Sequence, residues 1–130
     1  MTFPKDIEIV VVDDLDDMRE AMVKSLRRLG YENVVTCTDG ADALSQLKAM
    51  PDVRLVISDW NMEPVDGLGL LAGMRQIPHL RNVPFILVSA EAGPQRANQA
   101  MEAGVSVFLA KPFDATTLGE AMATTAKDYA

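Results

Sequence analysis

The apolar run Leu55-Val56-Ile57 constrains the fold of this chain more than any other stretch. Its apolar residues are consecutive rather than alternating, which is typical of a strand in a parallel sheet with both faces covered. Pro64 and Gly67 bound the run downstream. Asp59 stands where this strand ends, at the edge where open α/β sheets bind ligands. A carboxylate there can be a nucleophile, a metal ligand or both, and on this stretch alone a loop-capping Asp fits equally well.

Strand-like runs and segments of helical periodicity alternate five times along the chain. The predicted strands are 7–12, 34–37, 55–59, 85–89 and 107–110, and the predicted helices cover about 18–29, 40–50, 67–75, 95–103 and the segment from 115 onward. Right-handed crossovers then give an α/β, flavodoxin-like, doubly wound sheet of five parallel strands in the order 2-1-3-4-5, with five helices. We find no repeat or linker, so residues 1–130 are expected to form a single domain with no output domain.

The composition is compatible with one such domain and excludes several classes of function. Of the 130 residues 48% are hydrophobic, yet no run approaches the roughly 20 apolar residues of a membrane span. The N-terminus lacks the features of a signal peptide, and the single cysteine allows no internal disulfide. The net charge of −7 opposes binding to nucleic acid. We therefore expect a cytoplasmic, monomeric protein that binds neither nucleic acid nor membrane.

Polar residues follow four of the predicted strands. Asp13 and Asp14 follow the first strand, Asp59 ends the third, Ser89 ends the fourth and Lys111 follows the fifth. In the predicted strand order these ends lie side by side. Each residue has an ordinary structural explanation alone, such as a helix cap for the Asp pair. Their convergence on one edge predicts a functional site.

Three carboxylates packed together repel one another unless a cation or a proton intervenes. Mg²⁺ prefers oxygen ligands of this kind and also neutralises an incoming phosphoryl group. Ser89 offers a hydroxyl group and Lys111 a compact positive charge to phosphoryl oxygens. Asp59 would then attack phosphorus to give an aspartyl phosphate. The sequence therefore predicts a Mg²⁺-dependent phosphoryl-transfer site.

Four motifs in order and at compatible spacing make the chain similar to the receiver domain of two-component response regulators. They are Val10-Val11-Val12-Asp13-Asp14, Ser58-Asp59-Trp60-Asn61-Met62, Val88-Ser89-Ala90-Glu91 and Lys111-Pro112-Phe113. The resemblance spans nearly the whole chain. The Asp-Trp-Asn-Met run most resembles the CheY-like regulators of chemotaxis. The resemblance therefore implies a phosphoprotein of phosphorelay signal transduction.

The resemblance also implies the role of each site residue. Asp59 is the phosphoacceptor, and Lys111 is the lysine of the family pattern, followed by a cis bond to proline. Asp14 binds Mg²⁺ directly together with Asp59, Asp13 acts through water, and Asn61 contributes its backbone carbonyl. No cofactor other than Mg²⁺ is implied.

Ser89 and Phe108 stand at the two switch positions of the family. Phosphorylation of Asp59 would draw Ser89 inward and let Phe108 turn, which remodels the surface of the fourth helix, fifth strand and fifth helix. Phe108 replaces a Tyr at this position of CheY-like proteins, and an ordinary core Phe is the alternative explanation. Pro64 also departs from the pattern by one residue, so we expect a different loop shape after the acceptor.

The expected function is that of a stand-alone response regulator receiver. Its donor would be a histidine kinase or a histidine phosphotransfer protein, and its output a downstream protein target. It would not be an enzyme beyond catalysing its own phosphorylation and dephosphorylation. The alternatives are a phosphorelay intermediate, a phosphate sink, or a pseudo-receiver that acts by binding alone.

Two other families use the same fold or a similar nucleophile. A flavodoxin needs a phosphate-binding loop after the first strand, where Asp13 and Asp14 would repel the flavin phosphate. A phosphatase of the haloacid dehalogenase type needs a second Asp two residues after its nucleophile, where this chain has Asn61. The sequence therefore disfavours both an electron carrier and a phosphatase.

Overall fold

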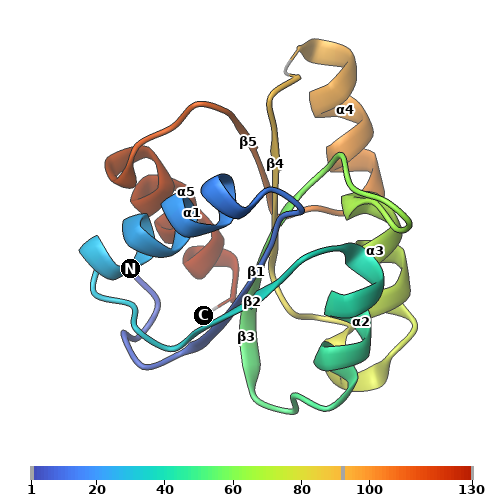
Figure 1. Cartoon of the computed structure of the whole chain (residues 1–130), viewed down its shortest axis with the longest axis horizontal. Coiled ribbons are helices and arrows are strands. Elements are labelled where there is room, and N and C mark those ends of the chain that lie inside the picture. The colour runs from blue at the N-terminus through green and yellow to red at the C-terminus, as the bar shows by residue number, and fades with distance from the viewer. Residues whose placement is uncertain (1, 92, 130) are drawn as a thin grey trace.

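The computed structural model describes residues 2–91 and 93–129 as alternating strands and helices (Figure 1). The strands are β1 (Glu8–Val12), β2 (Val34–Cys37), β3 (Val53–Asp59), β4 (Phe85–Ser89) and β5 (Val107–Ala110). The helices are α1 (Asp16–Arg28), α2 (Gly40–Lys48), α3 (Gly67–Arg75), α4 (Pro94–Ala103) and α5 (Ala115–Tyr129), with a short 3-10 helix η1 (Pro78–Leu80). Within the described ranges, no helix combines the length and apolar character needed to cross a membrane.

The five strands form one sheet in the order β2-β1-β3-β4-β5, and the neighbouring pairs are all parallel. This confirms the predicted strand order and fold class. Parallel neighbours require crossover connections, and the helix between each pair of successive strands supplies one.

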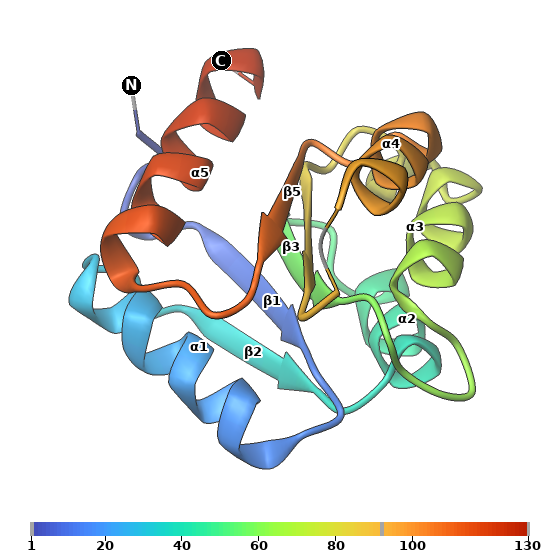
Figure 2. The same cartoon turned by 90° about the horizontal axis from the view of Figure 1, so that it is seen from above.

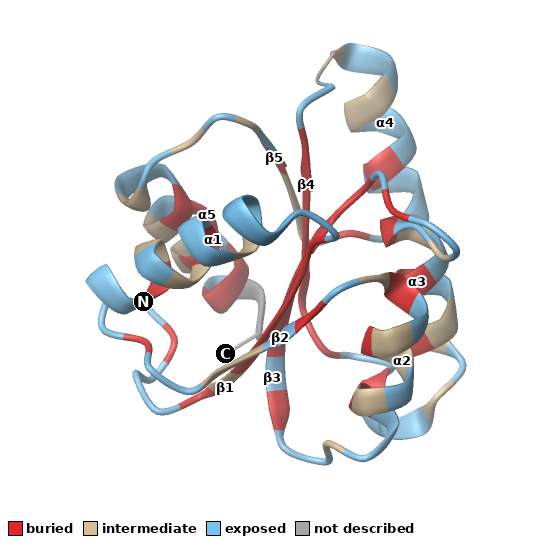
Figure 3. Cartoon of the chain, in the orientation of Figure 1, coloured by how far each residue is buried: buried red, intermediate tan, exposed pale blue. Residues whose placement is uncertain are grey.

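Helices cover both faces of the sheet. In the two views of Figures 1 and 2, α1 and α5 lie on one face and α2, α3 and α4 on the other. Alternate residues of β1 supply the two faces, since Ile9 and Val11 belong to the core cluster beneath α1 and α5, and Val10 and Val12 to the opposite cluster. Burial of one such aliphatic side chain stabilises a fold by about 1.5–3 kcal/mol. The three central strands β1, β3 and β4 are therefore almost entirely buried, as Figure 3 shows.

The observed boundaries differ from the predicted ones by a few residues. Helix α1 begins at Asp16, two residues earlier than predicted, and its first turn carries Asp16 and Asp17, which favour the positive end of the helix dipole. Helix α4 begins at Pro94, whose fixed φ suits a first helical position. The sequence prediction missed η1. These differences leave the order and type of the main elements unchanged.

Local side-chain and backbone signals set several helix ends. Asp39 accepts a hydrogen bond from the backbone N–H of Asp42 at 2.8 Å, and Asp66 accepts one from Gly69 at 2.8 Å. Each such cap contributes about 1 kcal/mol. Gly30 follows α1 with φ of 96°, a left-handed conformation that glycine adopts without strain. These residues thus fix where α1 ends and where α2 and α3 begin.

Gly67 lets the start of α3 approach the end of β3. A Cβ atom at this position would lie 2.5 Å from the carbonyl oxygen of Asp59 and 2.6 Å from Cδ1 of Leu87. The backbone N–H of Gly67 donates to the carbonyl of Trp60 at 2.9 Å. Gly67 therefore fixes the loop that follows Asp59.

We expect Gly67→Ala to lower the free energy of unfolding by about 1–3 kcal/mol, because the added methyl group overpacks a site that includes backbone. Urea unfolding followed by circular dichroism measures the change. Gly93→Ala is the matched control, since a Cβ at Gly93 would meet no atom within 4 Å. Equal stability of the two variants would contradict the close approach.

Cys37 is a buried free cysteine at the end of β2. Burial, and to a lesser extent the negative charges of Asp42 and Asp39, raises the pKa of its thiol to about 11. The folded state therefore holds this proton more tightly than the unfolded chain, and stability falls as the pH rises from about 8.5 towards 11.

At pH 8 about one Cys37 thiol in a thousand is ionised in the folded protein, against about a quarter in an unfolded chain. We expect Ellman's reagent to react at least about 100-fold more slowly with the native protein than with the protein in urea. Comparable rates in the two states would show that Cys37 is accessible and ionised.

Candidate functional site

Strands β1, β3, β4 and β5 end at one edge of the sheet because of their register. The paired positions nearest this edge are Val12 with Ser58, Asp59 with Val88, and Ser89 with Ala110. Asp59 and Ser89 are the last residues of their strands, and Asp13 and Lys111 follow theirs directly, whereas Phe108 lies within β5. The backbone N–H of Lys111 also donates to the carbonyl of Ser89 at 2.8 Å.

Asp13, Asp14 and Asp59 form one acidic cluster. Each offers a carboxylate oxygen, and these three oxygens lie within 4.8 Å of one another. Asp13 and Asp59 are buried, with exposed fractions of 6% and 9%, whereas Asp14 is exposed. The cluster therefore has two carboxylates in the protein interior and one that faces solvent.

The side chain of Lys111 joins the two buried carboxylates. Its Nζ lies 3.3 Å from Oδ2 of Asp13 and 3.1 Å from Oδ1 of Asp59. The peptide bond between Lys111 and Pro112 is cis, as the resemblance implied. One positive charge faces three negative ones, so the cluster keeps an excess of negative charge.

Burial raises the pKa of Asp59 above that of an ordinary aspartate, and the charge of Asp13 adds to this effect. The charge and hydrogen bond of Lys111 and the backbone N–H of Trp60 act in the opposite direction. Because burial is the largest contribution, the ionised form of Asp59 is less favoured than in water. Removal of water from a carboxylate also makes it a stronger nucleophile.

The donor set of the cluster fits a hard divalent cation. Carboxylate oxygens are the preferred ligands of Mg²⁺, which is usually held by one or two carboxylates together with water. Exposed Asp14 leaves the cluster open to solvent on one side. A cation bound there would compensate the charge that Lys111 leaves unbalanced.

The two predicted switch residues occupy different surroundings. Ser89 is fully buried, and its Oγ accepts a hydrogen bond from the backbone N–H of Glu91 at 3.1 Å. Phe108 is half-buried and meets Trp60 edge to face, with ring centroids 5.8 Å apart and planes at 83°. The ring of Phe108 therefore lies beside the residue that follows Asp59.

Asn61 lies on the surface, and its side-chain oxygen accepts a hydrogen bond from Arg96 at 3.4 Å. Its backbone carbonyl is the group that the resemblance assigned to the cation. The loop beyond it contains a cis bond between Glu63 and Pro64, and a different loop shape was expected here from the position of Pro64.

The sequence prediction missed two residues that contact the site. Ser58 is buried, and its hydroxyl donates to the carbonyl of Asp59 at 2.8 Å, which fixes the backbone at the acceptor. Arg96 of α4 stacks on the ring of Trp60, with its guanidinium carbon 3.7 Å from the ring centroid. No sequence signal marked Arg96, because the rotation of α4 about its axis decides where that side chain points.

An apolar groove adjoins the acidic cluster between α1 and the loop after β5. Its lining includes the apolar residues Met18, Met22, Pro112 and Phe113, together with Asp13 and Lys111. Met18 is one of the few exposed large hydrophobic residues of the described chain. The groove thus offers an apolar contact surface directly beside the charged groups of Asp13 and Lys111.

Comparison with known proteins agrees with the fold and identifies the family. The family model of the response regulator receiver domain matches residues 9–123. The chain is 35% identical to chemotaxis protein CheY1 of Helicobacter pylori over 114 residues, which are 88% of this chain and 92% of that protein. It is 38% identical to chemotaxis protein CheY-3 of Vibrio cholerae over 116 residues, which are 89% of this chain and 88% of that protein.

Solved structures give the same result. The structure of Vibrio cholerae chemotaxis protein CheY4 superposes with a TM-score of 0.84 at 26% identity, covering 92% of this chain and 98% of that one. A response regulator receiver protein of Pseudomonas putida gives a TM-score of 0.79 at 29% identity, covering 92% and 97%. The match of the family model over most of the chain and the identity to these relatives show that the chain belongs to the response regulator receiver family and is of the CheY type.

Proposed function

We propose that this receiver takes a phosphoryl group from a phosphohistidine donor onto Asp59 in a Mg²⁺-dependent reaction. Proteins of this family are signalling proteins rather than enzymes that turn over a separate substrate. The observation that carries the proposal is the Lys111 ammonium group, which bridges Asp13 and Asp59 within a cluster of three carboxylates. This arrangement supplies a nucleophile, a metal ligand set and a fixed positive charge together.

In the proposed reaction a carboxylate oxygen of Asp59 forms a bond to phosphorus while the bond from phosphorus to the donor nitrogen breaks. The electron pair of that bond leaves with the imidazole, which becomes neutral by taking up a proton. Lys111 and the Ser89 hydroxyl stabilise the charge on the phosphoryl oxygens. Attack of water on phosphorus later regenerates the Asp59 carboxylate and releases inorganic phosphate.

Asp14, Asp59 and the backbone carbonyl of Asn61 would hold the cation directly, and Asp13 would hold it through water. Bound Mg²⁺ supplies charge neutralisation for the incoming phosphoryl oxygens. Asp14 suits direct binding because it is exposed beside the two buried carboxylates.

Phosphorylation would act on the rest of the molecule through Ser89. Its hydroxyl would leave the N–H of Glu91 and donate to a phosphoryl oxygen. The space vacated above β4 would admit the ring of Phe108, which is now half-buried against Trp60. This changes the surface formed by α4, β5 and α5, where we place the binding site for a downstream protein.

We infer that the donor is a histidine kinase or a histidine phosphotransfer protein, which would dock at the apolar groove between α1 and the loop after β5. The groove supports this assignment because Asp13 and Lys111 are among the residues that line it. The similar proteins of Helicobacter pylori and Vibrio cholerae are chemotaxis proteins, which favours a chemotaxis-type protein target. The stand-alone, cytoplasmic and monomeric state expected from the sequence stays a prediction.

We expect acetyl phosphate and Mg²⁺ to transfer a single phosphoryl group to the protein. Intact mass spectrometry measures the adduct, and acid-urea electrophoresis measures its yield. Asp59→Asn removes the nucleophile while it preserves size, so it should abolish the adduct. Addition of EDTA should lower the rate of formation by at least about 100-fold. An adduct that persists in Asp59→Asn would contradict the assignment of the acceptor.

The variant Lys111→Ala should show two opposite changes. Loss of the positive charge leaves the acidic cluster more negative, so Mg²⁺ should bind more tightly in a titration followed by Trp60 fluorescence. Loss of charge stabilisation at the phosphoryl group should nevertheless slow phosphorylation by about 100-fold.

The control for this pair of measurements is Lys127→Ala, which removes an exposed lysine of α5. It should leave both quantities unchanged. A slower reaction accompanied by weaker Mg²⁺ binding in Lys111→Ala would indicate a disrupted fold and would not support the role of Lys111.

A further inference from the structure

Arg96 connects helix α4 to the loop that follows the acceptor. Its guanidinium group stacks 3.7 Å from the centroid of the Trp60 ring. One nitrogen, Nη2, lies 3.4 Å from Oδ1 of Asn61 and 3.7 Å from the carboxylate of Glu91. A single side chain therefore contacts both residues that follow Asp59 and a residue of the loop after β4.

The contacts of Arg96 are individually weak. The distances to Asn61 and Glu91 are long for charge-assisted hydrogen bonds, and the carboxylate side chain of Glu91 is 70% exposed. The Nε of Arg96 is buried and has no hydrogen-bond partner among the described residues. Burial of this unpaired N–H donor is unfavourable in free energy, and this offsets part of the favourable attraction between the guanidinium and the Trp60 ring. The arrangement is therefore one that a modest rearrangement can release.

Each proposed switch residue, Ser89 and Phe108, contacts a residue that in turn contacts Arg96. The Oγ of Ser89 accepts from the backbone N–H of Glu91, whose carboxylate faces Arg96. The edge of Phe108 meets the ring of Trp60, and the exposed fraction of Trp60 is only 3%. Arg96 packs on the face of the same ring. A movement of Ser89 or Phe108 must therefore change the surroundings of Arg96.

We propose that Arg96 is a positioning residue that restrains the resting conformation of the receiver by holding the Trp60 ring against Phe108. Release of Arg96 lets Trp60 and Phe108 rearrange and moves the first turn of α4 away from the acceptor loop. Removal of the side chain then favours the switched conformation before any phosphoryl group is bound. The inference deepens the proposed function and rests on it, because it assigns a regulator of the same switch.

Arg96→Ala tests the restraint first in the resting protein. Trp60 is the only tryptophan of the chain, so its fluorescence reports on this contact directly. We expect acrylamide to quench Trp60 several-fold more efficiently in Arg96→Ala, and the emission to shift towards that of the phosphorylated wild type. Arg96→Lys keeps the positive charge and should retain part of the protection of Trp60 against acrylamide. Arg96→Gln should lose that protection as Arg96→Ala does.

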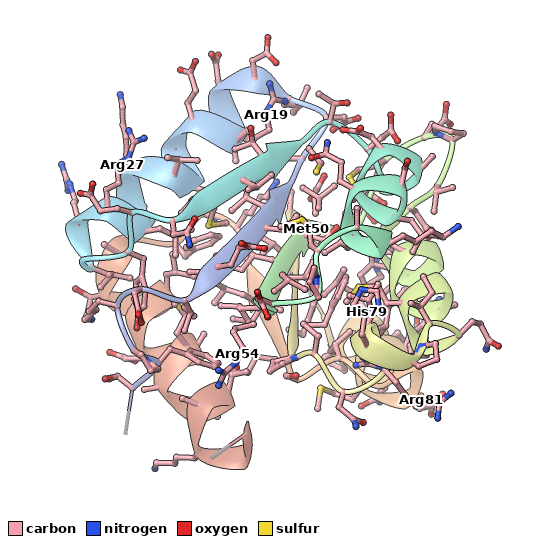
Figure 4. All side chains as sticks on the ribbon, turned by 90° about the horizontal axis from the view of Figure 1, so that it is seen from below. Arg19, Arg27, Met50, Arg54, His79 and Arg81 are labelled. Carbon is pink, nitrogen blue, oxygen red and sulfur yellow. The ribbon has the colours of Figure 1, made fainter. Side chains whose placement is uncertain are left out.

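The second measurement is the rate of phosphorylation by acetyl phosphate at saturating Mg²⁺. We expect Arg96→Ala to react about threefold to tenfold faster than the wild type, since a larger fraction of the protein is in the reactive conformation. Arg81→Ala is the control of equal charge change: Arg81 is exposed in the connection between η1 and β4, at the end of the sheet away from the acceptor (Figure 4). It should match the wild type in both measurements.

The outcomes separate the two proposals. If the wild type is phosphorylated and Arg96→Ala matches it in both acrylamide quenching and phosphorylation rate, Arg96 does not restrain the resting conformation. The proposed function then stands. Faster quenching with a slower reaction would also overturn it, because Arg96 would then assist the chemistry. If the wild type itself takes up no phosphoryl group, the proposed function fails and this inference fails with it.

Discussion

The proposed chemistry depends on the ion pairs between Lys111 and the two buried carboxylates of Asp13 and Asp59. These residues come from β1, β3 and the end of β5, so the pairs connect segments that are up to 98 positions apart in the chain. A buried carboxylate without a partner destabilises a fold by several kcal/mol, on the order of 3–5 when one member of a pair is lost. The parallel sheet is what brings the partners together.

Burial and function oppose each other at this site. The apolar strands that stabilise the fold also bury Asp59, which raises the pKa of its carboxyl group. Lys111 compensates for only part of the negative charge of the three carboxylates, and the remaining negative charge favours a bound cation. The fold thus tolerates a local electrostatic cost that the large cores on both faces of the sheet outweigh.

Most of the fold could be predicted from the sequence because its signals are local. Apolar runs of strand length, Gly30 after α1 and Asp39 before α2 each act within a few residues. The acidic cluster could be predicted as well, since the ends of parallel strands meet at one edge. The same reasoning placed Lys111 there.

Other features depend on tertiary packing and could not be predicted from the sequence. The position of Arg96 over Trp60 depends on the rotation of α4, a helix of mostly polar residues in which only Ala100 is buried. The buried hydroxyl of Ser89 points to the backbone of its own loop, which a residue type alone does not specify. For Phe108, the structure shows a half-buried ring rather than one fully in the core.

The central claim is that the carboxylates of Asp13, Asp14 and Asp59 form a single cation site beside Lys111. Titration with Mn²⁺, a paramagnetic substitute for Mg²⁺, followed by nuclear magnetic resonance tests it most directly. We expect selective broadening of the backbone amide signals of Asp13, Asp14, Asp59 and residues 60–61. The signals at the opposite end of the sheet, where the strands begin, should be unaffected. Broadening spread over the acidic surface of α1, or absent altogether, would contradict it.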